Sequence, residues 1–484
     1  MLLEKSKIVW VYLLTAMFLA VNFYLILNKD FYWFFLLPVV LVILYYYIVS
    51  LDKIVLLITF FTPLAVNIQL FDAGLAVSLP TEPLMFGVLL MFLAKVLFEH
   101  KYDKKIASHP VSYVIYLGLF WMFLTSFTSE LPVVSFKHFL SRLWFVVPFY
   151  FVTAIMFKET KNIHRFLWLY MTALMFIIFY TVTIHAKYGF DEDAGHWVMS
   201  PFYNDHTAYG AALAIFFPII IAFIFYPGFS LWKRLFALFL FAVYTVGIIL
   251  SYSRAAWISV IFAFAVFIVV MLKIKFRWLL LGTIIFIGLF VSFQQQILDA
   301  LEKNKQDSSE NFVEHVRSIT NISSDASNLE RINRWQSAIR LFNDRPLFGW
   351  GPGTYQFVYA PYQRSKEKTI ISTNLGDKGN AHSEYLGPLS EEGLPGMLMV
   401  FLLVGFIIYT GLMVYKKGNR EVKFLSLAAT LGLITYYVHG FLNNFLDTDK
   451  LSVPVWGFTA IIVALDVYHL NMKNKEENGQ ETAE

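Results

Sequence analysis

Long runs of apolar residues alternate with short polar connections along most of this chain. A helix that crosses a bilayer needs about 17 to 25 mostly apolar residues, and about fourteen runs approach that length. The runs are residues 8–27, 31–50, 53–71, 82–98, 110–128, 139–157, 164–185, 206–226, 232–250, 255–272, 276–294, 396–415, 424–443 and 451–469. The pattern predicts an all-α polytopic membrane protein with about 12 to 14 transmembrane helices.

One long polar segment interrupts the apolar pattern and divides the chain. We expect transmembrane helices over residues 1–295, a catalytic loop with amphipathic helices over residues 296–395, further transmembrane helices over residues 396–470 and a polar tail over residues 471–484. Inside the loop, a helix is expected to begin at a capping box and to end near Asn343, before Pro346. Its capping residues are Ser327 and Glu330, and its apolar stripe is Ile332, Trp335, Ile339 and Phe342.

The connections between the apolar runs differ in their content of Lys and Arg. With the N-terminus in the cytoplasm, the odd-numbered connections hold roughly twenty basic residues and the short even-numbered ones about five. Because basic residues accumulate on the cytoplasmic side, both termini are expected to be cytoplasmic. The even-numbered connections and the long loop are then expected to face outward.

Composition narrows the function classes. The 484 residues are 58% hydrophobic and 15% charged. The net charge of +4 is small and unevenly placed among the connections, so it indicates topology and not a nucleic-acid partner. The chain has no cysteine, which excludes thiolate catalysis and thiolate metal sites. Histidines and carboxylates show no metal-ligand spacing, and phosphate-binding glycine motifs are absent, so we expect neither a metal nor another cofactor.

The end of the long loop carries the strongest candidate for chemistry. His382 precedes a short amphipathic stretch that breaks at Gly393, Pro395 and Gly396, and an apolar run follows directly. His382 should therefore lie at a membrane surface, where an imidazole can meet both water and a lipid-borne substrate.

Three arginines are candidates for binding an anionic group. Arg254 is the sole charge in a very short outward connection, where an arginine either reaches the lipid headgroups or binds phosphate oxygens. Arg331 and Arg334 lie three residues apart on the predicted loop helix, so they project from one face. A solvated helix face is the alternative to phosphate binding for this pair, and Arg340 points the opposite way.

Two further outward groups could line a polar cavity. Lys137, His138 and Arg142 begin one span, and Arg142 falls inside the apolar run, where an ionisable residue is costly. Asn204, Asp205 and His206 begin another span, and a helix N-cap is the simpler explanation for Asn204 or Asp205.

Together these stretches resemble the O-antigen ligase and polymerase family of bacterial envelope glycosyltransferases, most closely the ligases. The ligase signature is a His, then Asn, Ser or Gln, nine residues, a Gly, two residues, and Gly, Thr or Tyr. Here it is met by His382, Ser383, Gly393 and Gly396. Residues 331–353 look like the family's Arg-x-x-x-Trp helix and its glycine-rich turn, which aligns Arg331 with the family arginine, and SYSRAAW looks like the element that supplies Arg254.

The resemblance implies metal-independent, inverting transfer of a glycan from an undecaprenyl pyrophosphate carrier on the periplasmic face of the bacterial inner membrane. His382 would be the general base, and Arg254 and Arg331 would hold the diphosphate. Arg334, Arg142, Lys137, Asn204 and His206 are further substrate-binding candidates. The acceptor would be lipid A–core for a ligase, a second lipid-linked glycan for a polymerase, or a protein Ser or Thr for an oligosaccharyltransferase. A polysaccharide transporter or flippase is the alternative from another class.

Overall fold

The protein is described from a computed structural model that covers residues 2–70, 75–100, 102–275, 277–278, 326–368, 372 and 379–470. The chain divides into two units, Met1–Ile54 and Val55–Glu484. In the first unit, the helix α1 (Leu2–Lys29) is followed by a 3₁₀ turn at Trp33–Leu36 and the helix α2 (Leu37–Val49). Helix α3 (Leu51–Phe61) runs across the boundary between the units.

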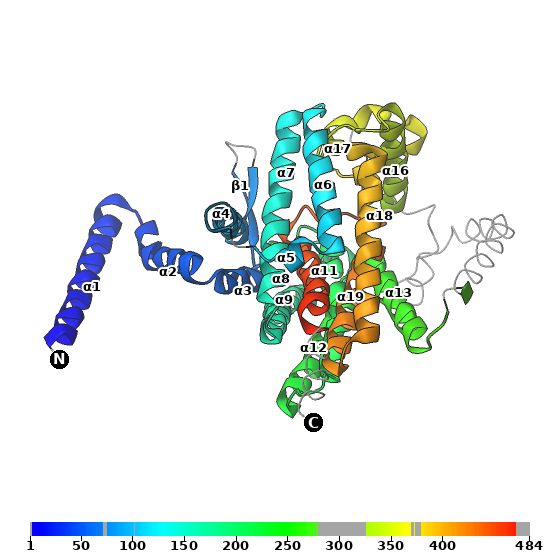
Figure 1. The fold of residues 1–484 in the computed structure, drawn as a ribbon. Coiled ribbons are helices and arrows are strands. Elements are labelled where there is room, and N and C mark those ends of the chain that lie inside the picture. Colours follow the sequence, from blue (N-terminus) through cyan, green and yellow to red (C-terminus); the bar gives the residue numbers. More distant parts are fainter. Residues whose placement is uncertain are drawn as a thin grey trace, which may run out of the picture. The chain divides into compact units, whose positions relative to one another are not determined.

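The second unit is a helical bundle with one small β-hairpin (Figure 1). Its elements before the long loop are β1 (Val66–Leu70), β2 (Leu75–Leu79), α4 (Thr81–Glu99), α5 (Lys104–Ala107), α6 (Pro110–Phe127), α7 (Pro132–Val146), a π-helical stretch at Val147–Val152, α8 (Thr153–Met156), α9 (Thr160–Lys187), α10 (Glu192–Gly195), α11 (His206–Ile224), α12 (Leu231–Leu250) and α13 (Arg254–Met271). Those after it are α16 (Ala326–Asp344), α17 (Tyr355–Val358), 3₁₀ turns at Ala360–Tyr362 and Ser365–Glu367, α18 (Leu386–Lys417), α19 (Arg420–His439), α20 (Asp449–Ala464) and a π-helical end at Leu465–His469.

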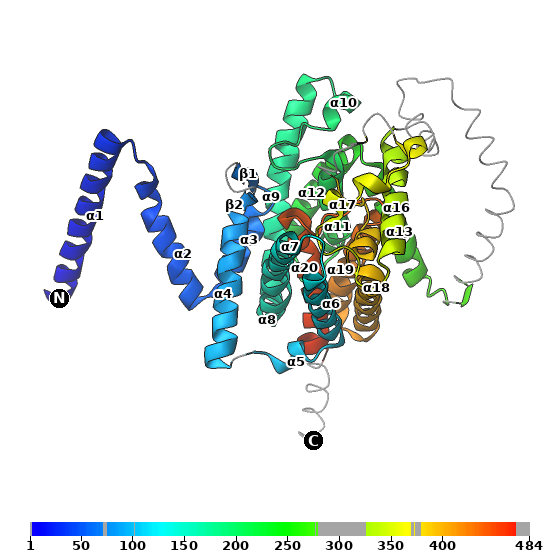
Figure 2. The same cartoon turned by 90° about the horizontal axis from the view of Figure 1, so that it is seen from above.

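Helices α11, α19 and α20 form the centre of the bundle. Seen from above, α19 and α20 lie among α6, α7, α11 and α18 (Figure 2). Small residues let the backbones approach closely, because a Cβ at Gly432 of α19 would lie 2.5 Å from the Ile215 carbonyl oxygen of α11. Helix α16 packs against α18, so the loop helix lies directly on the bundle.

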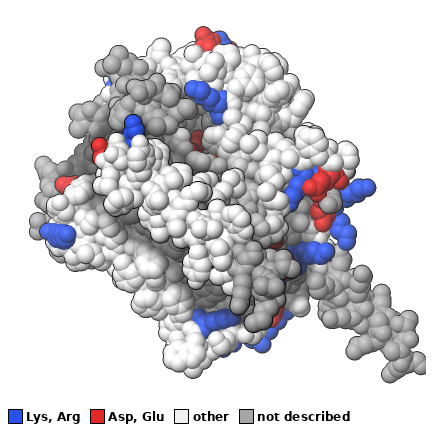
Figure 3. Space-filling model, turned by 90° about the vertical axis from the view of Figure 1, so that its left-hand side faces the viewer, with Lys and Arg blue, Asp and Glu red and all other residues white. Residues whose placement is uncertain are grey.

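The predicted all-α polytopic fold is confirmed. Within the described residues, eleven helices are long and apolar enough to cross a membrane, and Trp33–Val49 is a shorter apolar helix. The expected span at residues 276–294 lies almost entirely outside the described residues. Large apolar side chains are exposed along α12, α13 and α18, as lipid-facing helices require. The face drawn in Figure 3 is mostly uncharged, with Lys and Arg gathered towards its margins.

The expected span at residues 53–71 is wrong. Helix α3 ends at Phe61, and β1 then pairs antiparallel with β2. A buried cation from the other end of the sequence explains this, because the Lys450 ammonium donates to the carbonyl oxygens of Thr62 at 2.5 Å and Ala65 at 2.6 Å. It thereby satisfies carbonyl groups that the end of a helix leaves without partners.

Candidate functional site

His382 lies in a tight turn just before α18. Its backbone is in the left-handed region at φ 47°, which is uncommon for a residue with a side chain and tends to occur at functional sites. The Asn380 side-chain oxygen accepts a hydrogen bond from the His382 backbone N–H at 3.1 Å. The Ser383 hydroxyl oxygen accepts from the backbone N–H groups of Tyr385 and Leu386, both at 3.3 Å, which begins the helix.

Helix α16 holds this turn through two side chains. The Trp335 indole N–H donates to the His382 carbonyl at 3.3 Å, and Arg334 Nη1 donates to the Asn380 carbonyl at 3.2 Å. Arg334 Nε also pairs with Glu330 Oε1 at 2.9 Å, and these side chains are only 7% and 5% exposed. Arg334 therefore uses Nε and Nη1 to position the turn, although the sequence suggested it for substrate binding.

The buried face of α16 is not the expected apolar stripe. Ile339 is exposed, and Ile332, Trp335 and Phe342 are only partly buried. The buried positions are instead Glu330, Asn333, Arg334, Ser337, Ala338 and Leu341. They follow helical spacing, but most of them are polar. Loop residues supply their partners, as when Asn333 Nδ2 donates to Gln363 Oε1 at 2.8 Å. The helix ends at Asp344, close to the predicted end at Asn343. The expected start at the capping box is wrong, because Ala326 and Ser327 are already helical.

Some of the basic and imidazole side chains that the sequence singled out lie near the starts of three helices and act on one another electrostatically. Helices α11 and α13 begin with His206 and Arg254, and α18 begins just after His382. Arg254 and Arg331 both act electrostatically on His206, and Arg331 also acts on His382. Segments more than 100 residues apart in the sequence thus contribute to one cationic site.

The environment of His382 favours its neutral form. Burial and the nearby charges of Arg334 and Arg331 lower the pKa of His382 to about 4, against the opposite effects of Asp205 and of a hydrogen bond with the Asn443 side chain. Among the described residues, the Asn443 amide nitrogen has no hydrogen-bond partner, so the amide oxygen makes this bond and the His382 ring N–H donates it. The second ring nitrogen of a neutral imidazole is then an acceptor.

Asp205 and its neighbours form the second side of the site. Asp205 is the N-cap of α11, where Oδ1 accepts from the backbone N–H groups of Thr207 at 2.7 Å and Ala208 at 2.8 Å. The His206 ring stacks on the His196 ring with centroids 4.3 Å apart, and Asn204 is exposed. The capping interpretation is therefore correct for Asp205.

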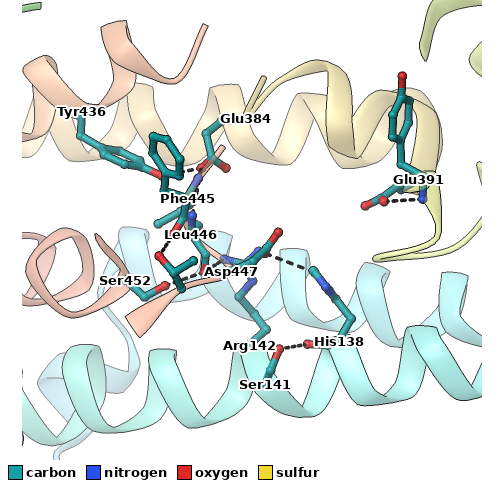
Figure 4. Close-up of polar contacts among 12 residues, drawn as sticks. His138, Ser141, Arg142, Glu384, Glu391, Tyr436, Phe445, Leu446, Asp447 and Ser452 are labelled. Carbon is teal, nitrogen blue, oxygen red and sulfur yellow. Dashed lines mark hydrogen bonds and ion pairs between the residues drawn. The ribbon is translucent and has the colours of Figure 1, made fainter. Parts of the chain in front are cut away.

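Arg142 and Glu384 lie on opposite sides of the loop that follows α19 (Figure 4). Arg142 Nη1 donates to the Leu446 carbonyl at 3.1 Å, and its Nη2 pairs with Asp447 Oδ1 at 2.9 Å. His138 Nε2 lies 3.6 Å from the same Asp447 oxygen, whereas Lys137 is exposed. Arg142 thus holds a loop in place.

Glu384 joins that loop to the His382 turn. Its buried carboxylate accepts from the backbone N–H groups of Phe445 at 2.7 Å and Leu446 at 3.1 Å and from the Tyr436 hydroxyl (Figure 4). Its own backbone N–H donates to the Gly440 carbonyl at 2.8 Å. No sequence pattern pointed to Glu384, because its partners lie some 50 to 60 residues away along the chain.

Backbone conformation and close packing require glycine at positions in the ligase signature and in the turn after α16. Gly393 breaks the regularity of α18 at φ 72°, and a Cβ there would lie 2.2 Å from the Leu347 carbonyl oxygen. Gly351, at φ 109°, donates its N–H to the Glu391 carbonyl at 2.7 Å. The turn after α16 is therefore packed onto the first turns of α18, immediately behind His382.

No group of three His, Asp or Glu side chains that could hold a metal ion occurs in the part of the chain that the structure describes. The site instead combines arginines with a neutral imidazole at the end of a bundle of apolar helices. The helices are long and apolar enough for a multi-pass membrane protein, and the arginines supply the positive charge that an anionic substrate would need.

Comparison with known proteins shows similarity to one family over part of the chain. Residues 236–401 match the O-antigen ligase family, and the match includes Arg254, Arg331 and His382. This region is therefore similar to the O-antigen ligase family, and the match supports the resemblance that the sequence motifs predicted. An uncharacterized protein of Haemophilus influenzae is 21% identical over 132 residues, which are 27% of this chain and 32% of that protein.

Proposed function

We propose that the protein is an O-antigen ligase: an inverting glycosyltransferase that moves a glycan from undecaprenyl pyrophosphate to lipid A–core. The observation that carries the proposal is that Arg254 and Arg331 both act electrostatically on His206, and that Arg331 also acts on His382. Arg254, Arg331 and His382 come from three separate parts of the chain, and all three lie in the region that matches the family.

The two arginines are proposed to bind the diphosphate of the donor. A guanidinium stays charged and matches phosphate oxygens with two parallel N–H groups. In the transition state, negative charge accumulates on the departing diphosphate, and fixed cations stabilise it more strongly than water does. Arg334 is assigned a positioning role instead, because its N–H groups are engaged with Glu330 and Asn380.

His382 is proposed to be the general base. Its neutral ring donates one N–H to Asn443, which leaves the other nitrogen to accept the proton of the acceptor hydroxyl. The acceptor oxygen bonds to the anomeric carbon of the donor as the bond from that carbon to the diphosphate oxygen breaks. The electron pair leaves with undecaprenyl pyrophosphate, and the proton remains on His382 until solvent or the released diphosphate takes it.

The distribution of basic residues supports a periplasmic site. The few Lys and Arg of the even-numbered connections include Arg254, at the site, and Lys450, which is buried against backbone carbonyls. These two residues therefore have roles that do not require the cytoplasmic side, whereas the odd-numbered connections carry most of the positive charge.

A reconstituted reaction tests the proposal. Purified full-length protein would be incubated with undecaprenyl-pyrophosphate-linked O-antigen, with EDTA present, and with either lipid A–core or a second lipid-linked repeat unit. We expect glycosylated lipid A–core as the product. Product formation only with the second repeat unit would identify a polymerase, and absence of any new glycosidic bond with both acceptors would overturn the proposal.

A further inference from the structure

His439 and Asn443 carry buried polar atoms that have no hydrogen-bond partner among the described residues. His439 is the last residue of α19 and is 1% exposed, and Asn443, four residues later, is 2% exposed. Both ring nitrogens of His439 and the amide nitrogen of Asn443 lack a hydrogen-bond partner among the described residues. A buried polar group without a partner costs about 1 to 3 kcal/mol, so such groups normally meet water or a ligand.

These atoms lie beside the proposed catalytic groups. The charges of Arg331 and Asp205 and the ring of His206 act on the His439 ring. Asn443 shares a hydrogen bond with His382 through its amide oxygen. The Gly440 carbonyl, between the two residues in sequence, accepts from the Glu384 backbone N–H at 2.8 Å, which fixes this segment against the His382 turn. The unsatisfied atoms therefore belong to residues that interact with Arg331 on one hand and with the proposed base on the other.

The chemistry of these atoms suits a hydroxyl group. A neutral imidazole offers one donor and one acceptor, and the amide nitrogen offers two further donors. A sugar hydroxyl both donates and accepts, so it can use this set, whereas a phosphate oxygen only accepts and would be attracted to the arginines.

We propose that His439 and Asn443 form a subsite for the sugar that is attached directly to the donor diphosphate. The inference rests on the proposed function, because it places the diphosphate at Arg254 and Arg331 and the attacked carbon between them and His382. The two residues hydrogen-bond hydroxyls of that sugar and distinguish a glycosylated carrier from the bare carrier.

Binding measurements with two lipids test the subsite. The affinity of the purified full chain would be measured for undecaprenyl pyrophosphate and for the same lipid carrying one sugar. We expect wild-type protein to bind the sugar-bearing lipid more tightly. His439→Phe keeps a ring and removes both nitrogens. It should lower the affinity for the sugar-bearing lipid about tenfold and leave the affinity for the bare lipid unchanged. Arg254→Ala should weaken both.

Two further variants separate a lost contact from a disturbed fold. His439→Gln keeps a donor and an acceptor and should retain part of the preference for the sugar-bearing lipid. His164→Phe is a matched control, since His164 also has a buried ring nitrogen without a partner among the described residues. His164 packs against Phe223, near the end of α11 opposite His206, and its replacement should leave both affinities unchanged.

The outcomes separate the subsite from the proposed function. An unchanged preference in His439→Phe, or an equal loss for both lipids, would overturn the sugar subsite while leaving glycosyl transfer in place. If wild-type protein bound neither lipid, the proposed function itself would fail. Loss of preference in His439→Phe with retention in His164→Phe would support the subsite.

Discussion

Arg334 donates a hydrogen bond from Nη1 to the backbone carbonyl of Asn380, at 3.2 Å, two residues before His382. The same guanidinium pairs with Glu330 one turn earlier on α16. The loop helix therefore sets the position of the proposed base through a buried ion pair, and the variants below follow from this arrangement.

Arg334→Met should destabilise the protein strongly. It leaves the Glu330 carboxylate buried without its ion-pair partner, which costs about 3 to 5 kcal/mol. Glu330→Met combined with Arg334→Met removes both charges and should recover most of that stability. Thermal unfolding in detergent would give the melting temperatures of the wild type, the single variant and the double variant. Equal melting temperatures for the single and double variants would contradict this explanation.

His382→Ala should abolish transfer with little change in donor binding. General-base catalysis contributes about 10²- to 10⁴-fold to a rate, so at least that loss is expected. Arg254→Ala and Arg331→Ala should instead weaken both donor affinity and turnover. Full activity in His382→Ala would remove the base assignment, which steady-state kinetics alongside donor binding would reveal.

The pH dependence of kcat/KM should show no inflection near the ordinary histidine value. Because the pKa of His382 is lowered to about 4, its ring is already neutral at pH 5, so kcat/KM should be flat from about pH 5 to 8 with respect to this group. Donor diphosphate adds negative charge beside the ring, which favours the imidazolium, so the inflection in kcat should lie at higher pH than that in kcat/KM. A kcat/KM inflection close to 6.5 that disappears in His382→Ala would contradict this environment.

The same pKa has a consequence for stability. Between about pH 4 and 6.5, unfolded His382 binds a proton that the folded protein does not, so this residue makes stability fall as the pH decreases through that window. The acid dependence should be weaker in His382→Gln, which does not titrate. Unfolding midpoints of the two proteins across this range would measure the difference, and parallel profiles would contradict it.

Gly379→Ala should impair both stability and transfer. A Cβ at Gly379 would lie 1.6 Å from Arg334 Nη1, so the arginine would have to leave the Asn380 carbonyl. Gly387→Ala, in the first turn of α18, is a matched control, because its Cβ would meet no atom within 4 Å. It should be neutral or stabilising by up to about 1 kcal/mol. Similar losses in both variants would show that the effect does not come from Arg334.

Lys137→Ala and Arg142→Ala should differ. Arg142 contacts the Leu446 carbonyl and Asp447 and its side chain is 14% exposed, so its loss should release the loop that Glu384 also holds. Lys137 is exposed, and its replacement should change stability by less than about 0.5 kcal/mol. If Lys137 nevertheless binds substrate, as the sequence suggested, donor affinity would fall without a change in melting temperature.

The sequence by itself determined most of the spans. A helix in lipid satisfies its backbone hydrogen bonds internally, so a sufficiently long apolar run is enough to predict it. Local motifs also placed His382 before α18, Arg254 at the start of α13 and the end of α16 near Asn343. These features depend on residues that are neighbours in the chain.

Only the tertiary structure decided the features that depend on distant partners. The run at 53–71 is interrupted because Lys450 binds its carbonyl groups. The buried face of α16 is polar because Gln363 and Asn380 supply hydrogen bonds that hydrophobic periodicity does not register. Glu384, His439 and Asn443 could not be selected from the sequence for the same reason. The role of a polar side chain depends on the groups that folding brings into contact with it.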